Sequence, residues 1–218
     1  MTFSRCQETD ILRGGDWDDP SIPLVSFDPG TTCVGMALYE LDPIRLKIRR
    51  CEAKTFIAKS SVLDHRYASI HGEKNARLHY LRNKILDELI YFGPHYAFCE
   101  DTYDNRLRPS AYGPLVESTS SLRSAVEEYD PLTPLRMVES SSAKKTLHIK
   151  GSGPTLKDKV REAVLACSEI ADAYSGNLYE CDEHSFDSLL IGYCGILMLR
   201  EELRMSEPKI TAGVIELY

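Results

Sequence analysis

The stretch from Val25 to Ala37 constrains the fold of this chain more than any other. It reads VSFDPGTTCVGMA: an apolar strand ending on Asp28, a Pro-Gly turn and a second apolar strand. Gly30 allows the sharp turn because it has no Cβ. The hairpin leaves the Asp28 carboxylate at a sheet edge with nothing bulky over it. A carboxylate in that position suits a metal-dependent phosphoryl-transfer site or a nucleotide-phosphate site.

Two large groups of proteins open a domain with a similar hairpin. In actin, sugar kinases and chaperone ATPases the turn surrounds phosphates, and in ribonuclease H-like nucleases the same Asp holds a metal. An ordinary hairpin turn is the third interpretation, since short motifs also arise by chance. The length of 218 residues suits one α/β domain. An actin-like ATPase needs two such domains and a second phosphate hairpin, which the sequence lacks, so length disfavours a kinase.

Composition and cysteine spacing predict a protein of a reducing compartment. The seven cysteines form an odd set without CxxC spacing, which is typical of buried thiols rather than of disulfides or a zinc site. The N-terminal residues show no secretion signal. The longest apolar run, Leu189 to Leu199, is too short to span a bilayer. We therefore expect a soluble, cytoplasmic protein without a membrane partner.

Charge is distributed unevenly along the chain, whose net charge is −7. Six basic residues and one acid lie between Lys144 and Arg161, and seven acids and no Lys or Arg lie between Glu162 and Asp187. Basic blocks bind phosphate backbones and acidic clusters bind metal ions. Two solvated helix faces would give the same pattern, so charge alone leaves both interpretations open.

Hydrophobic periodicity predicts a mixed sheet flanked by helices. We expect one domain over 21–205, a loose N-terminal arm over 1–20 and a C-terminal tail over 206–218. The expected strands cover 22–28, 33–40, 45–58, 96–100 and 134–138, the helices cover 73–92, 110–128, 157–171 and 183–204, and 59–72 is expected as a loop.

Four side chains form a candidate catalytic and metal site. Asp28 and Glu100 each end a strand, and if these strands are parallel neighbours both carboxylates emerge at one sheet edge. His184 and Asp187 share a face at the start of the last helix, because they lie three residues apart. Each residue alone could be a strand end, a cap or a core side chain. Their joint placement favours a site for two Mg²⁺ ions, or Mn²⁺, which tolerates a His ligand better.

These residues resemble the motif set of the RuvC family of Holliday-junction resolvases, within the ribonuclease H-like superfamily. The resemblance covers about residues 22–200 and implies a ribonuclease H-like mixed five-stranded sheet. It also implies that Asp28, Glu100, His184 and Asp187 hold two metals that hydrolyse phosphodiester bonds. The arm before Ser21, the long segment 59–72 and the acidic net charge depart from the family. They suggest a divergent member, of bacterial or phage origin.

The resemblance also implies which residues contact DNA. A basic loop over 144–153 matches the family's loop before its penultimate helix, and an aromatic residue stands three positions after Glu100. The implied DNA-binding residues are Lys144, Lys145, Lys150, Lys157, Lys159 and Tyr103.

The function implied is paired nicking of four-way DNA junctions by a homodimer, without a nucleotide cofactor. The resemblance places the dimer interface on the 110–128 helix, and a twofold dimer would supply one active site per strand. One alternative is a nuclease of the same fold that cuts other branched DNA or RNA. Another is a junction- or RNA-binding protein that does not cut, although a pure binder has no need of crowded carboxylates.

Overall fold

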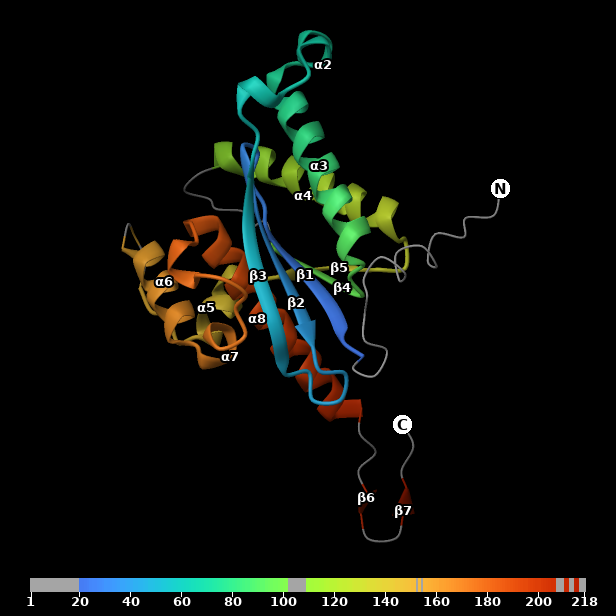
Figure 1. Ribbon diagram of the computed structural model, residues 1–218, viewed down its shortest axis with the longest axis vertical. Coiled ribbons are helices and arrows are strands. Elements are labelled where there is room, and N and C mark those ends of the chain that lie inside the picture. The colour runs from blue at the N-terminus through green and yellow to red at the C-terminus, as the bar shows by residue number, and fades with distance from the viewer. Residues whose placement is uncertain are drawn as a thin grey trace, which may run out of the picture.

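The computed structural model describes residues 20–101, 109–151, 153, 155–206, 210–211 and 214–215. A central sheet is covered by helices on both faces (Figure 1). In chain order the elements are β1 (Ile22–Asp28), β2 (Cys33–Leu41), β3 (Ile48–Ile57), α2 (His65–His71), α3 (Glu73–Phe92), β4 (Tyr96–Glu100), α4 (Pro109–Tyr129), β5 (Leu135–Val138), α5 (Ser140–Thr146), α6 (Leu156–Ala166), α7 (Ser168–Ala171) and α8 (Glu183–Ser206). Short 3-10 turns occupy Ser60–Val62 and Leu178–Glu180, and a separate two-stranded sheet pairs β6 (Ile210–Thr211) with β7 (Val214–Ile215).

The sheet is mixed and five-stranded, in the order β3-β2-β1-β4-β5. β1, β2 and β3 form an antiparallel meander, whereas β4 and β5 run parallel to β1. The parallel arrangement requires crossover helices, which α3 and α4 supply. The expected α/β class with a mixed five-stranded sheet is confirmed.

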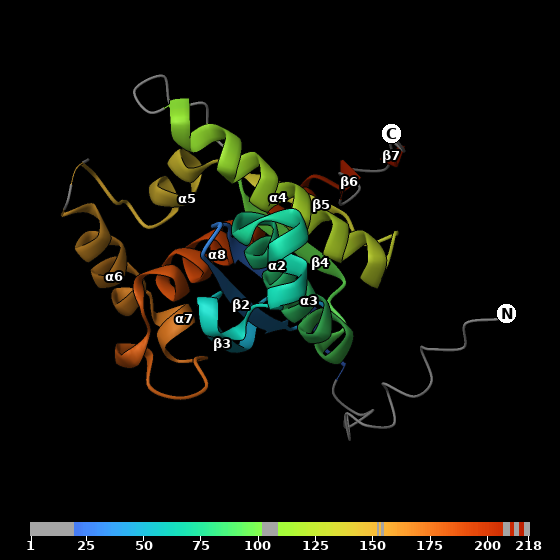
Figure 2. The ribbon, with the colours of Figure 1, turned by 90° about the horizontal axis from the view of Figure 1, so that it is seen from above.

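Both faces of the sheet are buried, as the apolar strands require. Leu24 and Phe98 face the layer that contains α8. Val25, which follows Leu24, and Ala97, which precedes Phe98, face the opposite layer with α3 and α4. Figure 2 shows α2, α3 and α4 on one side and α5 to α8 on the other. Each strand therefore contributes alternate side chains to two separate cores.

Helix α8 lies directly against the sheet, and two glycines make this possible. A Cβ on Gly192 would lie 2.3 Å from the Tyr39 ring, and one on Gly195 would lie 2.6 Å from the Phe98 ring. The Tyr39 hydroxyl donates to the Leu189 carbonyl at 2.6 Å, which fixes the helix along β2. The N-terminal turn of α8 is thereby held at the edge where β1 ends.

Strands β1 and β4 and helix α3 match their predicted boundaries, and the other predicted strands and the helices over 110–128 and 183–204 are present with small shifts. The expectation of a loop over 59–72 is wrong, because α2 forms there. Asp64 caps it by accepting from the backbone N–H groups of Arg66 and Tyr67, and the Tyr67 ring stacks on His79 at 4.5 Å. No residue of α2 is fully buried, and only Tyr67 and Ala68 pack against the core, which is too few positions to give a clear apolar period.

Two further expectations need correction. The basic stretch over 144–153 is not all loop, because Lys144 and Lys145 lie in the last turn of α5. The helix expected over 157–171 is broken, because Cys167 has an extended backbone that separates α6 from α7. Within the described residues no helix is long and apolar enough to cross a membrane. Residues 1–19 of the expected arm, and much of the expected tail, lie outside the described part.

Candidate active site

Two carboxylates lie at the same edge of the sheet because their strands are parallel neighbours. Phe27 pairs with Cys99, so Asp28 and Glu100, the next residue of each strand, leave the sheet side by side. Asp28 is only 9% exposed, and Glu100 is partly buried. The carboxyl ends of β1 and β4 therefore deliver two acids to one half-buried position.

The N-terminus of α8 reaches this edge through a cap and a glycine. The Asp182 carboxylate accepts from the Ser185 backbone N–H at 2.8 Å and from the Thr55 hydroxyl of β3 at 2.6 Å. Gly35 of β2 lies so close that a Cβ there would be 2.1 Å from the carbonyl oxygen of His184. The cap and this close approach together place the first turn of α8 over the end of β1.

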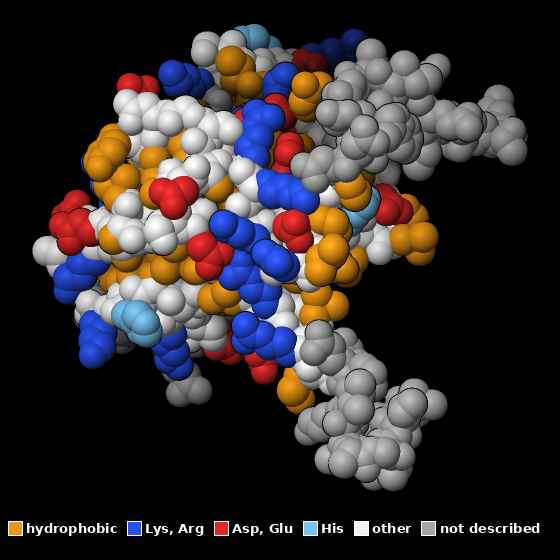
Figure 3. Space-filling model, turned by 60° about the horizontal axis from the view of Figure 1, so that its bottom comes forward, with side chains coloured by type: hydrophobic (Ala, Val, Ile, Leu, Met, Phe, Trp, Pro, Cys, Tyr) orange, Lys and Arg blue, Asp and Glu red, His pale blue; other side chains and the backbone are white. Residues whose placement is uncertain are grey.

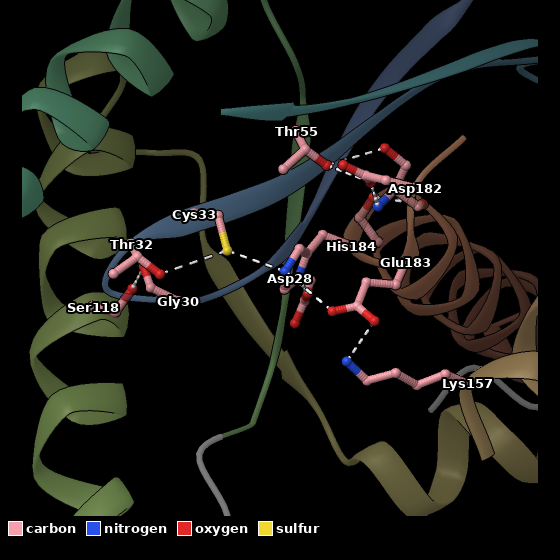
Figure 4. A network of polar contacts seen from close by, with 12 residues as sticks. Asp28, Gly30, Thr32, Cys33, Thr55, Ser118, Lys157, Asp182, Glu183 and His184 are labelled. Atoms are coloured by element: carbon pink, nitrogen blue, oxygen red, sulfur yellow. Dashed lines mark hydrogen bonds and ion pairs between the residues drawn. The ribbon is translucent and has the colours of Figure 1, made fainter. Parts of the chain in front are cut away.

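His184 lies between Asp28 and Cys33 (Figure 4). Its Nδ1 is 2.7 Å from the Asp28 carboxylate, and its Nε2 is 3.0 Å from the Cys33 sulfur. The hydrogen bond to Asp28 raises the pKa of the imidazole above its usual value. Burial raises the pKa of the Cys33 thiol, so Cys33 is a neutral neighbour and not an activated thiolate.

Asp187 completes the group of acids from one helical turn further along α8. Burial, and then the negative charges of Asp28 and Glu100, raise the pKa of Asp187 to about 7. Burial also raises the pKa of Glu100, and Asp28 adds to the effect. Glu100 and Asp187 line one cavity together with Ser140, Lys144 and Lys157. Carboxylates crowded in this way repel one another until a cation or a proton joins them.

The donor chemistry of this group fits a hard divalent cation. Three carboxylates, two of them with a raised pKa, supply oxygen ligands in a half-buried place. Within the described residues no three His, Cys, Asp or Glu side chains are arranged so that they could hold an ion as they stand. Asp28 and His184 instead hydrogen-bond to each other. Ion binding would have to exchange that contact for metal–ligand contacts.

The structure separates the predicted DNA-binding lysines into two groups. Lys144 and Lys157 line the cavity beside the carboxylates. The Lys144 ammonium donates to the Ser140 hydroxyl at 2.7 Å, and Lys157 lies 2.5 Å from the Glu183 carboxylate. Lys145, Lys150 and Lys159 are exposed and lie outside that lining, and the Lys159 ammonium donates to the Lys150 carbonyl at 3.0 Å. Tyr103 lies outside the described residues.

The acidic segment over 162–187 divides between structural contacts and the site. Of its seven acids, Asp182 caps α8 and Glu169 pairs with Arg200 at 2.6 Å, while Asp187 joins the site. The end of the sheet far from Asp28 shows the same neutralisation, for example between Arg49 and Asp42 at 2.9 Å. Lys and Arg side chains stand among Asp and Glu on the face in Figure 3. Lys144 and Lys157 are the better candidates for a phosphate-binding surface, because they line the cavity beside the carboxylates.

Sequence reasoning missed the neighbours that orient the site. Ser140 lies between Lys144 and Glu100, because its hydroxyl accepts from Lys144 and also hydrogen-bonds to Glu100. A polar serine run after a buried strand signals a helix start, and could have indicated it. Cys33 was interpreted only as a buried thiol, and Glu183 only as part of a charge run. No sequence pattern places the Cys33 thiol beside His184 or the Glu183 carboxylate against Lys157.

Comparison with known proteins places the fold. No protein-family model and no curated protein matches the sequence. A structure of Thermus thermophilus RuvC aligns over 83% of this chain and 97% of that one, with 15% identity and a TM-score of 0.60. A second T. thermophilus RuvC structure, in complex with a Holliday junction substrate, aligns over 83% and 96%, with 15% identity and a TM-score of 0.58. The fold of this chain is thus ribonuclease H-like, as the sequence predicted.

Proposed function

We propose that this chain is a divalent-metal-dependent DNA endonuclease that resolves four-way junctions by paired nicks. The observation that carries the proposal is the meeting of Asp28, Glu100 and Asp187 at one sheet edge, beside Lys144 and Lys157. A surface that only bound DNA would be weakened by crowded acids next to its phosphate contacts. The ribonuclease H-like fold, shared with a RuvC structure in complex with a Holliday junction substrate, supports the choice of branched DNA.

Asp28, Glu100, His184 and Asp187 are the proposed metal-holding residues. Two Mg²⁺ or Mn²⁺ ions, when bound, supply a more acidic water and a counter-charge for the leaving 3′ oxygen. The protein residues orient the reaction around that chemistry. Asp28 and Glu100 are fixed by their strands, while Lys144 and Lys157 supply positive charge for the backbone phosphates on the α5–α6 side. The exposed Lys145, Lys150 and Lys159 would extend this surface.

The proposed assembly is a homodimer, because symmetric nicking of two strands needs two active sites related by a twofold axis. Helix α4 is the proposed interface. Tyr112 and Val116 lie one turn apart on it and are 41% and 37% exposed, which gives it an uncovered apolar stripe. Sedimentation of the wild type and of Val116→Glu tests this: a dimer that the substitution dissociates supports the interface, and a monomeric wild type contradicts it.

The decisive experiment compares DNA substrates. The purified protein is incubated with a mobile four-way junction, a flap and a linear duplex, with Mg²⁺ or with EDTA, and Asp28→Asn serves as the inactive control. We expect paired nicks in the junction, only with Mg²⁺ and only with the wild type. Preferred cutting of the flap would favour a related nuclease with another branched substrate. Tight binding without cutting in Mg²⁺ or Mn²⁺ would favour a non-cleaving protein.

A further inference from the structure

Glu183 is the first residue of α8, and its carboxylate reaches two neighbours of the site. One oxygen lies 2.5 Å from the Lys157 ammonium, and the other lies 3.7 Å from Nε2 of His184. Figure 4 shows the side chain between these two partners. Glu183 and Lys157 are both exposed, so an incoming molecule can reach the pair.

The proposed function assigns a different partner to Lys157, a phosphate of the DNA backbone. A carboxylate oxygen and a phosphate oxygen satisfy an ammonium in the same way. While the Lys157 ammonium is paired with the Glu183 carboxylate, its charge is partly compensated and its attraction for a phosphate is weaker. The carboxylate also adds negative charge where the DNA would enter. On the proposed function Glu183 would therefore oppose DNA binding, in contrast to Asp28, Glu100 and Asp187, whose charge the metal ions would neutralise.

We propose that Glu183 is a specificity-determining residue that competes with DNA phosphates for Lys157. A DNA must then supply enough other contacts to displace the carboxylate, so weakly held DNA, such as a linear duplex, is rejected in favour of a branched substrate. Specificity of this kind comes from a repulsive element against the wrong ligand. The inference rests on the proposed function and goes beyond it by naming the residue that makes stable binding depend on additional DNA contacts.

The expected size of the effect follows from the exposure of the pair. Exposed ion pairs are weak, so removing the competitor should tighten DNA binding roughly two- to fivefold. A new phosphate contact by Lys157 should also steepen the plot of log K against log salt by up to about 0.9. Both effects depend on Lys157, which separates competition from a general change in net charge.

The test is a double-mutant cycle between Glu183→Gln and Lys157→Ala. Dissociation constants are measured by fluorescence anisotropy in EDTA, for a labelled four-way junction and for a linear duplex, over a range of salt. We expect Glu183→Gln to tighten binding, more for the duplex than for the junction, and to lose this effect in the Lys157→Ala background. Glu180→Gln is the matched control, because it removes the same charge from an exposed acid nearby. It should have a small effect that is equal in both backgrounds.

Three results would overturn the inference. The first is tightening by Glu183→Gln that persists without Lys157 or equals that of Glu180→Gln, which would show a long-range charge effect only. The second is weaker DNA binding by Glu183→Gln. The third is a higher Mg²⁺ concentration for half-maximal thermal stabilisation of Glu183→Gln without DNA, which would make Glu183 a metal ligand. If the wild type binds neither DNA, the proposed function fails and the inference fails with it, whereas DNA binding with any of these three results overturns the inference alone.

Discussion

The imidazole of His184 and the carboxylate of Asp28 are 156 positions apart in sequence and are joined by a 2.7 Å hydrogen bond. The contact links the end of the first strand to the start of the last helix. It raises the pKa of His184. His184 and Asp28 are both proposed metal ligands. In the structure, their hydrogen bond compensates part of the negative charge of Asp28 that a bound ion would otherwise compensate.

Removing either strand-end carboxylate should separate cutting from binding. We expect Asp28→Asn and Glu100→Gln to abolish cleavage in Mg²⁺ and to keep or increase affinity for a four-way junction, because both acids are proposed to serve the metal and both repel DNA. Cleavage of end-labelled junctions and gel-shift affinities measure the two properties. Cleavage near the wild-type rate by either variant would contradict the site assignment.

Asp187 should make the metal-free protein less stable as pH rises. Burial, and then the charges of Asp28 and Glu100, raise the pKa of folded Asp187 from its ordinary value of 3.8 to about 7, so the folded protein holds the proton more tightly than the unfolded chain. The stabilisation of the fold that comes from this tighter proton binding is fully present below about pH 4 and is lost as pH rises towards 7. In EDTA, Asp187→Asn should therefore gain stability relative to the wild type over this range, by about 1–3 kcal/mol near pH 8.

Urea unfolding at pH 4, 6 and 8 measures this difference. Asp172→Asn is the matched control, because it removes one negative charge from an exposed acid at the end of α7. Parallel pH curves for Asp187→Asn and the wild type would show that Asp187 titrates normally. Mg²⁺ should stabilise the wild type more than Asp187→Asn at pH 8, since a ligand that binds only the folded state shifts its stability.

Gly35 should be required for the approach of α8 to β2. A Cβ there would lie 2.1 Å from the His184 carbonyl oxygen, so Gly35→Ala must move one backbone away from the other. We expect a loss of about 1–3 kcal/mol in stability, as for other overpacked positions, together with weaker metal binding. Thermal melts with and without Mg²⁺ check both effects.

Gly113→Ala is the comparison for Gly35→Ala. A Cβ on Gly113, in helix α4, would meet no atom within 4 Å, and alanine favours a helix over glycine. This variant should be neutral or slightly more stable than the wild type. Equal melting temperatures for Gly35→Ala and the wild type would mean that α8 does not depend on the close approach.

The strands and long helices were predictable because their periodicity is strong and their ends are marked. Helix α3 carries Leu81, Ile85 and Leu89 on one buried face and stops at Gly93, which has a left-handed backbone. The edge shared by Asp28 and Glu100 followed from strand order, since parallel neighbours end on the same side. These features depend on local sequence and on a few topological rules.

The remaining features depend on contacts that no local pattern encodes. Helix α2 has no fully buried residue and packs on the core only through Tyr67 and Ala68, so a side-chain cap and ring stacking also define it. In the sequence, Ser140 indicates only the start of a helix. Its contacts with Lys144 and Glu100 become visible only in the tertiary structure. The pairing of Glu183 with Lys157 joins two charge runs that read separately as solvated surfaces. Tertiary placement decided each of these cases.

Ser140 connects the proposed phosphate-binding lysine to a proposed metal-holding acid. Its hydroxyl accepts from Lys144 at 2.7 Å and hydrogen-bonds to Glu100, which holds down the pKa that burial raises in that carboxyl. Metal binding needs the deprotonated carboxylate. Loss of the hydroxyl should therefore weaken metal binding most where Glu100 is partly protonated.

We expect Ser140→Ala to raise the Mg²⁺ concentration for half-maximal cleavage by about tenfold, as for other residues that orient metal ligands. The increase should be larger at pH 6 than at pH 8, because the Glu100 carboxylate that lacks the Ser140 hydrogen bond binds a proton more readily. Ser140→Thr keeps the hydroxyl and should restore most of the affinity. Ser141→Ala removes a neighbouring exposed hydroxyl that bonds to Glu139 at 3.3 Å, and should leave the requirement unchanged. A Ser140→Ala effect that is the same at both pH values, and that threonine does not rescue, would make Ser140 a packing residue of α5 rather than a positioning residue for Glu100.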